Sequence, residues 1–106
     1  AFYSGGVALR YKPAAAVASC RRAGGTATLD MLNKYFTISC MPVVSSSYWN
    51  EIHGNTAEEA SKDAEGLQTM RTLGHNMAWL LKCIEAGRGA GIEPTKEKKV
   101  YTNFIR

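Results

Sequence analysis

Two short apolar runs and two helical repeats dominate the pattern of apolar and polar positions along this chain. Residues 14–18 read Ala-Ala-Ala-Val-Ala, with no polar residue between them. Such a run is typical of a strand that is buried on both faces, as in a parallel sheet covered by helices. Residues 41–44 (Met-Pro-Val-Val) predict a second strand. A proline stands at the entrance of each run, where its missing N–H group costs little.

The first helical repeat follows the first predicted strand and covers residues 26–39. Thr26 or Thr28 would cap this helix, because a threonine oxygen can accept a hydrogen bond from the first turn. The side chains expected to face the core are Leu29, Leu32, Tyr35 and Phe36, and those expected to face water are Asp30, Asn33 and Lys34.

The second helical repeat is longer and predicts a helix over residues 63–86, with Gly87 as the candidate C-cap. Its apolar stripe consists of Met70, Leu73, Met77, Leu80 and Ile84, widened by Trp79 and Cys83. His75 falls on the opposite side and is expected in solvent. Ahead of this helix, Thr56 and Glu59 have the spacing of a capping box and predict a short helical piece.

The order strand, helix, strand, helix predicts an α/β fold with a parallel sheet, and 106 residues suffice for one domain at most. We expect residues 1–11 to form a glycine-containing loop and residues 94–106 to form an extended tail. Phe104 and Ile105 are expected to be docked on this chain or on a neighbour, because exposed apolar residues at a chain end would be costly.

A polar loop rich in glycine follows the first predicted strand, at the place where ligands bind in open α/β sheets. Residues 19–26 read Ser-Cys-Arg-Arg-Ala-Gly-Gly-Thr. Gly24 and Gly25 allow a positive φ and let backbone N–H groups approach a ligand closely. The functional interpretation is a cradle for a polar, partly anionic ligand edge. The alternative is a tight strand-to-helix connection with arginines on the surface.

A second loop, residues 45–54, follows the second predicted strand and combines aromatic with polar side chains. Tyr48 and Trp49 could form an aromatic wall beside a flat ring, with Asn50 and His53 as polar contacts. The alternative is that the aromatic residues simply cover the edge of the sheet. Both loops are expected at the same edge, because the strands are predicted to be parallel.

Charge and cysteine usage narrow the classes of function. The net charge of +4 lies partly near the C-terminus and fits a solvated face, and no nucleic-acid recognition motif accompanies it. The three cysteines, Cys20, Cys40 and Cys83, show neither a CxxC pair nor Cys/His metal spacing. We therefore predict no metal site and no disulfide scaffold. Free cysteines fit a reduced, cytoplasmic protein. The apolar runs are far shorter than the ~20 residues of a membrane span, so no membrane partner is expected.

The sequence offers no self-contained acid–base machinery. His53 and His75 have no spacing that forms a metal site or a catalytic triad, and Glu58 and Glu59 form a solvated pair. This pattern favours a bound cofactor that carries the chemistry.

Several segments resemble the NADPH-dependent FMN reductase family, a flavodoxin-like group that includes iron–sulfur flavoproteins and multimeric quinone reductases. Residues 12–30 (Lys-Pro-Ala-Ala-Ala-Val-Ala-Ser-Cys-Arg-Arg-Ala-Gly-Gly-Thr-Ala-Thr-Leu-Asp) resemble its fourth strand, loop and helix. Residues 41–54 (Met-Pro-Val-Val-Ser-Ser-Ser-Tyr-Trp-Asn-Glu-Ile-His-Gly) are similar to its fifth strand and following loop. Residues 65–80 and 102–106 are similar to its last helix and its ending.

The resemblance implies that residues 1–106 are the C-terminal part of a single flavodoxin-like domain with a three-layer parallel sheet. The family's first strand, whose loop holds the FMN phosphate, has no counterpart in this sequence, so we expect the chain alone to lack a complete FMN site. The cysteine cluster of the iron–sulfur subgroup has no counterpart either.

The activity that the resemblance implies is that of an FMN-dependent NAD(P)H oxidoreductase acting as a dimer or tetramer. It would pass electrons from NADPH or NADH through FMN to a quinone, a flavin or another small-molecule acceptor. The alternatives are an electron carrier or FMN-binding module without turnover, and a truncated fragment without cofactor.

The same resemblance assigns the cofactor-binding residues. Residues 21–26 would line the pyrimidine edge of the flavin, with N–H groups of the loop donating to ring oxygens and Arg21 or Arg22 favouring the anionic reduced ring. Three residues of the second loop would shape the surroundings of the ring. The full set is Ser19, Cys20, Arg21, Arg22, Ala23, Gly24, Gly25, Thr26, Tyr48, Trp49 and Asn50.

Overall fold

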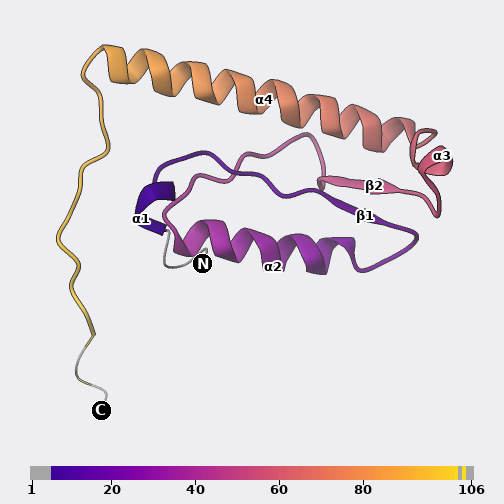
Figure 1. The fold of residues 1–106 in the computed structure, drawn as a ribbon, viewed down its shortest axis with the longest axis horizontal. Helices are drawn as coiled ribbons and strands as arrows, with labels where there is room; N and C mark the ends of the chain where they lie inside the picture. The colour runs from indigo at the N-terminus through magenta and orange to yellow at the C-terminus, as the bar shows by residue number, and fades with distance from the viewer. Residues whose placement is uncertain (1–5, 103, 105–106) are drawn as a thin grey trace.

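The computed structural model describes residues 6–102 and residue 104, and its helices and strands alternate along the chain until two consecutive helices close the order (Figure 1). The elements in chain order are α1 (Gly6–Leu9), β1 (Ala18–Cys20), α2 (Gly25–Ile38), β2 (Glu51–His53), α3 (Ala57–Ala60) and α4 (Ala64–Gly89). The mixed α/β class is therefore confirmed. The prediction of a loop over residues 1–11 is wrong for residues 6–9, which form α1. Residues 1–5 lie outside the described part of the chain.

β1 and β2 form a parallel pair in which Ala18, Ser19 and Cys20 lie opposite Glu51, Ile52 and His53. A separate parallel bridge joins Ala14 to Val43. The predicted strands at 14–18 and 41–44 were thus placed too early, and regular pairing begins where the first one was expected to end.

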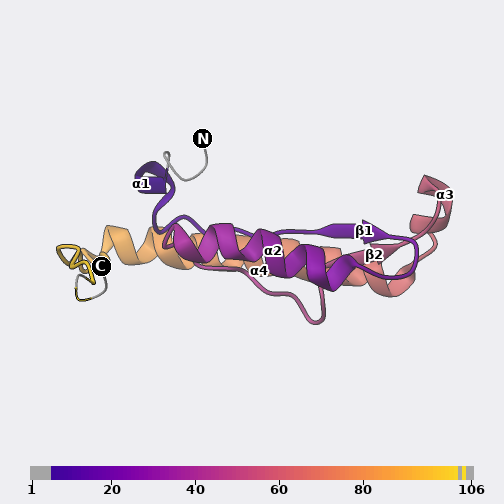
Figure 2. The ribbon, with the colours of Figure 1, turned by 90° about the horizontal axis from the view of Figure 1, so that it is seen from below.

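The reason for this shift is a bulging loop between the bridge and the regular pairing. Between the bridge and the regular pairing, the segment that leads into β1 advances four residues (14 to 18). The segment that leads into β2 advances eight residues (43 to 51). Residues 45–50 must therefore leave the sheet, and Figure 2 shows this segment protruding below it. The Asn50 side chain spans the gap, because its Nδ2 donates to the Ala16 carbonyl over 3.1 Å.

The two long helices lie on opposite sides of the strand pair, α2 beside β1 and α4 beside β2 (Figure 1). The apolar core consists of Ala14, Ala16, Leu29, Val44 and Leu73. Val17 is 54% exposed, so the prediction that residues 14–18 are buried on both faces is wrong. One face of this segment remains open, because the described chain has no element to cover it.

Helix α2 begins one residue earlier than predicted and without a side-chain cap. Gly24 is the N-cap, with φ of +92°, and Thr28 Oγ1 donates back to the Gly24 carbonyl over 2.9 Å. The predicted Thr26 or Thr28 cap is therefore wrong. A left-handed N-cap is a conformation that glycine adopts at little cost.

The inward face of α2 is rotated from the predicted one. Its inward positions are Gly25, Leu29, Asn33 and Phe36, whereas the predicted core residues Leu32 and Tyr35 are 36% and 52% exposed. Asn33, expected in water, is half-buried. The close approach of Gly25 to β2 sets this rotation, because a Cβ atom there would collide with the Glu51 carboxylate.

The start of α4 is tied to β2 by one side chain. Asp63 is the N-cap; its Oδ1 accepts from the Gly66 N–H over 3.0 Å, and its Oδ2 accepts from the His53 N–H over 2.8 Å. Just before it, Thr56 Oγ1 accepts from the Glu59 N–H over 3.2 Å and caps α3 as predicted.

The predicted stripe of α4 is confirmed, with Leu73 buried and Met70, Met77, Leu80 and Ile84 half-buried. The predicted widening is wrong, since Trp79 is 66% exposed and Cys83 is also exposed. His75 is exposed, as expected. The helix runs past the predicted Gly87 end to Gly89, and Gly91 takes the left-handed position after it, with φ of +83°.

The chain after α4 contains no helix or strand over residues 92–102 and runs away from the other elements (Figure 1). Phe104 is 82% exposed, so it does not dock on its own chain, and Ile105 lies outside the described residues. Across the part of the chain that the structure describes, none of the helices combines the length and the apolar character needed to cross a bilayer.

Candidate site at the carboxyl ends of the strands

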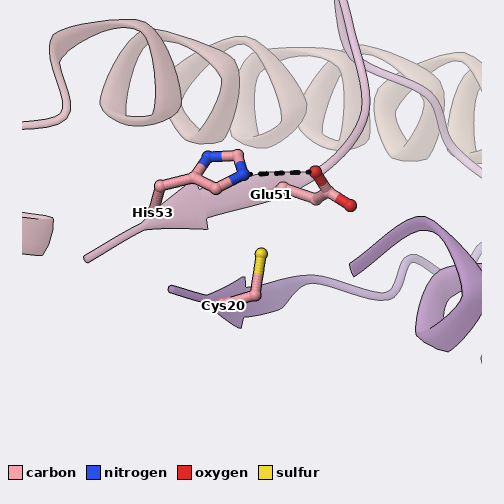
Figure 3. A group of neighbouring side chains, drawn as sticks. All are labelled: Cys20, Glu51 and His53. Atoms are coloured by element: carbon pink, nitrogen blue, oxygen red, sulfur yellow. Dashed lines mark ion pairs between the residues drawn. The ribbon is translucent and has the colours of Figure 1, made fainter. Parts of the chain in front are cut away.

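The carboxyl ends of β1 and β2 bring together three side chains with chemically active groups. Cys20 lies directly opposite His53 in the parallel register, and Glu51 stands two residues before His53. Side chains two residues apart on a strand share a face, so all three project to the same side. The cysteine sulfur, a carboxylate oxygen and an imidazole nitrogen lie within 4.8 Å of one another (Figure 3).

His53 stands between two carboxylates. Its Nε2 is 3.7 Å from Glu51 Oε2, and its Nδ1 is 3.6 Å from Asp63 Oδ2. Hydrogen bonds from the backbone N–H groups of Gly66 and then His53 lower the pKa of Asp63 below its usual value of 3.8, and the nearby imidazole adds to this effect. Asp63 is therefore a fixed anion beside the ring at neutral pH.

Glu51 is the most enclosed member of the cluster. Its side chain is 11% exposed, and its Oε1 is buried without a hydrogen-bond partner among the described residues. Two glycines in the turn between β1 and α2 make room for the Glu51 carboxylate. Gly24 supplies the positive φ of the turn, and Gly25 leaves the space that the carboxylate fills. The glycine pair thus has a structural role in this chain.

A groove of about 610 Å³ opens between α2 and the protruding loop of residues 45–50. Among its lining residues are four that the resemblance assigned to a cofactor: Thr26, Tyr48, Trp49 and Asn50. The Tyr48 and Trp49 rings are both exposed, with centroids 5.8 Å apart. Asn33 also lines the groove, and its Oδ1 is buried without a hydrogen-bond partner among the described residues.

Asn50 shapes the loop beside this groove. Its Oδ1 accepts a hydrogen bond from Ser46 Oγ over 2.6 Å, while its Nδ2 is bound to the Ala16 carbonyl. Ser46 Oγ also lies 2.8 Å from the Tyr48 carbonyl. Both ends of the Asn50 amide are thus engaged within the chain.

The predicted arginines lie elsewhere. Arg21 and Arg22 line a separate polar hollow of about 530 Å³, together with His53, Lys62 and Asp63. The structure therefore divides the predicted set: Thr26 and the second loop border the groove, the arginines border the polar hollow, and Cys20 and Gly25 lie at the cluster. Ser19 in β1 and Ala23 and Gly24 in the turn after it are exposed and line neither cavity.

Sequence reasoning missed Glu51 and Asp63 and did not connect His53 with Cys20. The alternation Glu-Ile-His at residues 51–53 was the available signal, since it puts two polar side chains on one face of a strand. It was overlooked because these residues were interpreted as loop.

Comparisons of the chain with models of protein families, with curated proteins and with solved structures give no match.

Proposed function

We propose that this chain is the C-terminal part of a flavodoxin-like domain in an FMN-dependent NAD(P)H oxidoreductase. The acceptor would be a quinone, a free flavin or another small molecule. The observation that carries the proposal is the groove beside the start of α2, where Tyr48 and Trp49 offer flat surfaces at the edge of a parallel sheet. Its volume falls in the range of about 300–1,000 Å³ that is usual for cofactor sites.

The residues of the groove suit a flat heterocycle with polar edges. The buried Asn33 Oδ1 is an acceptor that has no donor within the described part of the chain, and the pyrimidine edge of a flavin carries an N–H group that could supply one. Tyr48 and Trp49 would contact the ring face, and Asn50 would act indirectly by holding the loop. The Thr26 end of α2 adds backbone N–H groups that are not capped by a side chain.

FMN, when bound, would supply the redox chemistry between nicotinamide and the acceptor, while the chain supplies binding, orientation and charge. Arg21 and Arg22 are exposed and border the neighbouring polar hollow, and we propose that one of them extends its positive charge toward the pyrimidine edge. Such a cation would favour the reduced, anionic flavin over the oxidised one. The three free thiols fit a cytoplasmic enzyme.

We also propose that the protein works as a homo-oligomer, a dimer or tetramer. The outward face of α2 exposes Met31, Leu32, Tyr35 and Ile38, and α4 exposes Trp79. Apolar side chains grouped along one face of a helix are typical of surfaces that another chain covers.

The decisive test is FMN binding by the full-length gene product, with Trp49→Leu beside Trp79→Leu. The two tryptophans are 59% and 66% exposed, so neither substitution should unfold the protein, but only Trp49 lines the groove. Trp49→Leu should weaken FMN binding by roughly tenfold, about 1.4 kcal/mol, and Trp79→Leu should leave it unchanged. Equal affinities in the two variants would remove the groove from the proposal.

The alternatives separate in the same samples. Bleaching of the flavin absorption by NADPH or NADH, with reoxidation by added quinone, indicates an oxidoreductase. Stable flavin absorption without bleaching indicates an FMN-binding carrier without turnover. Protein without affinity for FMN would contradict the proposal and favour a fragment without cofactor.

A further inference from the structure

We propose that Cys20, Glu51 and His53 form a binding site for a zinc-type divalent metal ion at the carboxyl ends of β1 and β2. This inference does not depend on flavin binding, since the three residues lie outside the lining of the groove. Thiolate, imidazole and carboxylate are the donors that zinc takes in proteins. A thiolate with an imidazole disfavours magnesium and calcium, which prefer oxygen ligands throughout.

The distances are close to those of a tetrahedral site. Zinc bonds of about 2.0–2.3 Å place neighbouring donor atoms roughly 3.3–3.8 Å apart. His53 Nε2 and Glu51 Oε2 are already 3.7 Å apart, and all three donor atoms lie within 4.8 Å of one another. A movement of about 1 Å in the Cys20 and His53 side chains would complete the geometry, and Figure 3 shows the sulfur directed at the space between the other two groups.

The second carboxylate gives His53 the orientation that a metal ligand needs. Metal-binding histidines commonly direct their other ring nitrogen to a carboxylate, which fixes the ring and its tautomer. Asp63 Oδ2 lies 3.6 Å from His53 Nδ1 and is itself held by the backbone N–H of His53. A small movement of the ring would bring Nδ1 and Asp63 within hydrogen-bond length, and Nε2 already faces Glu51.

The burial of Glu51 also calls for a cation. Glu51 Oε1 finds no hydrogen-bond partner in residues 6–102 or residue 104, and an enclosed carboxylate oxygen of this kind is costly unless a positive charge compensates it. With the Cys20 thiol deprotonated and its proton released to solvent, the two anionic ligands neutralise a divalent ion, and the imidazole adds no charge. Three protein ligands leave a fourth position for water, as in zinc sites that are open to substrate.

Cobalt(II) and zinc(II) titrations of the purified protein test this proposal. Cobalt bound by a thiolate gives an intense near-ultraviolet charge-transfer absorption, so the wild-type protein should develop this band up to one equivalent. Zinc should then displace the cobalt and remove the band. No thiolate band with cobalt, or no binding of zinc in a calorimetric titration, would overturn the proposal and leave His53 as a bridge between two carboxylates.

Matched variants identify the ligands. Cys20→Ser should abolish the band, whereas Cys40→Ser and Cys83→Ser, which change exposed cysteines outside the cluster, should keep it. His53→Gln should weaken zinc binding at least tenfold, and His75→Gln should not. Circular dichroism of each variant verifies folding. A band that survives Cys20→Ser but disappears in either control variant would also overturn the proposal.

Discussion

At the scale of the residue, the Asp63 side chain holds the start of α4 against the carboxyl end of β2 through hydrogen bonds to the backbone. Asp63 accepts from two N–H groups, one at the start of its own helix and one in β2. Each bond favours the ionised carboxylate, which is why the pKa of Asp63 is lowered. The Asp63 side chain thus links the N-terminus of α4 to the candidate site.

The pH dependence of stability should report this arrangement. Because the folded pKa of Asp63 lies below its usual 3.8, the ionised group stabilises the folded state above that pH, and the contribution is lost as the pH falls through the lowered value. Asp63→Asn should therefore be less stable than wild type at pH 6, by urea unfolding with chelator present. The difference in the free energy of unfolding between the variant and wild type should disappear as the pH falls below about 4. A gap that stays constant in acid would contradict this assignment.

At the scale of the element, α2 and α4 end in the same way with different residues. In α4, the Ile92 N–H donates to the Gly87 carbonyl over 2.8 Å, and the Gly91 N–H donates to the Arg88 carbonyl over 3.0 Å. This pair of bonds defines a Schellman motif, and Gly91 has the positive φ it requires.

The end of α2 has the same pair of bonds. The Met41 N–H donates to the Phe36 carbonyl over 3.0 Å, and the Cys40 N–H donates to the Thr37 carbonyl over 3.2 Å. Here the left-handed residue is Cys40, with φ of +60°. A residue with a Cβ atom in this conformation costs roughly 1–2 kcal/mol relative to glycine.

Exchanging the residue types at these two ends should have opposite effects. Cys40→Gly should raise the free energy of unfolding by about 1 kcal/mol, and Gly91→Ala should lower it by a similar amount. Gly89→Ala is the control, since Gly89 lies within α4 with open space around an added Cβ and should be neutral or stabilising. Denaturant unfolding of the three variants measures this. Destabilisation by Cys40→Gly would show that the cysteine side chain matters more than the backbone strain.

At the scale of the whole molecule, the described fold leaves much surface uncovered. The accessible surface is 8441 Å², against about 5,800 Å² expected for a compact monomer of this mass. The radius of gyration is 17.2 Å, against about 13 Å for a compact domain of this length. The extended tail contributes to both values, but so do the exposed side chains of α2. Such a surface fits a chain that packs against further protein.

The oligomer should depend on the outward face of α2. Ile38→Lys places a charge on this face, where Ile38 is 65% exposed, and should shift the protein toward smaller species. Lys34→Glu changes an exposed charge on the same helix and should leave the mass unchanged. Light scattering coupled to size-exclusion chromatography measures the mass. A wild-type monomer of 11.6 kDa, or equal masses in all three proteins, would contradict the proposed assembly.

The sequence by itself determined the features that depend on near neighbours. The inward stripe of α4, the cap at Thr56 and the existence of α2 follow from spacings of three and four residues, because helix contacts are local. The two strands and their parallel direction could be expected, but their bounds could not. FMN binding, turnover and assembly remain proposals from the resemblance and from the groove.

Only the tertiary structure decided the register of the strands and everything that follows from it. Cys20 lies opposite His53 because residues 45–50 form a loop outside the sheet. The local sequence does not determine how many residues belong to this loop and how many to the strand. A shift of one residue would turn Glu51 and His53 to the other face and separate them from the sulfur. The rotation of α2 follows from the same register, since Gly25 must lie where Glu51 arrives.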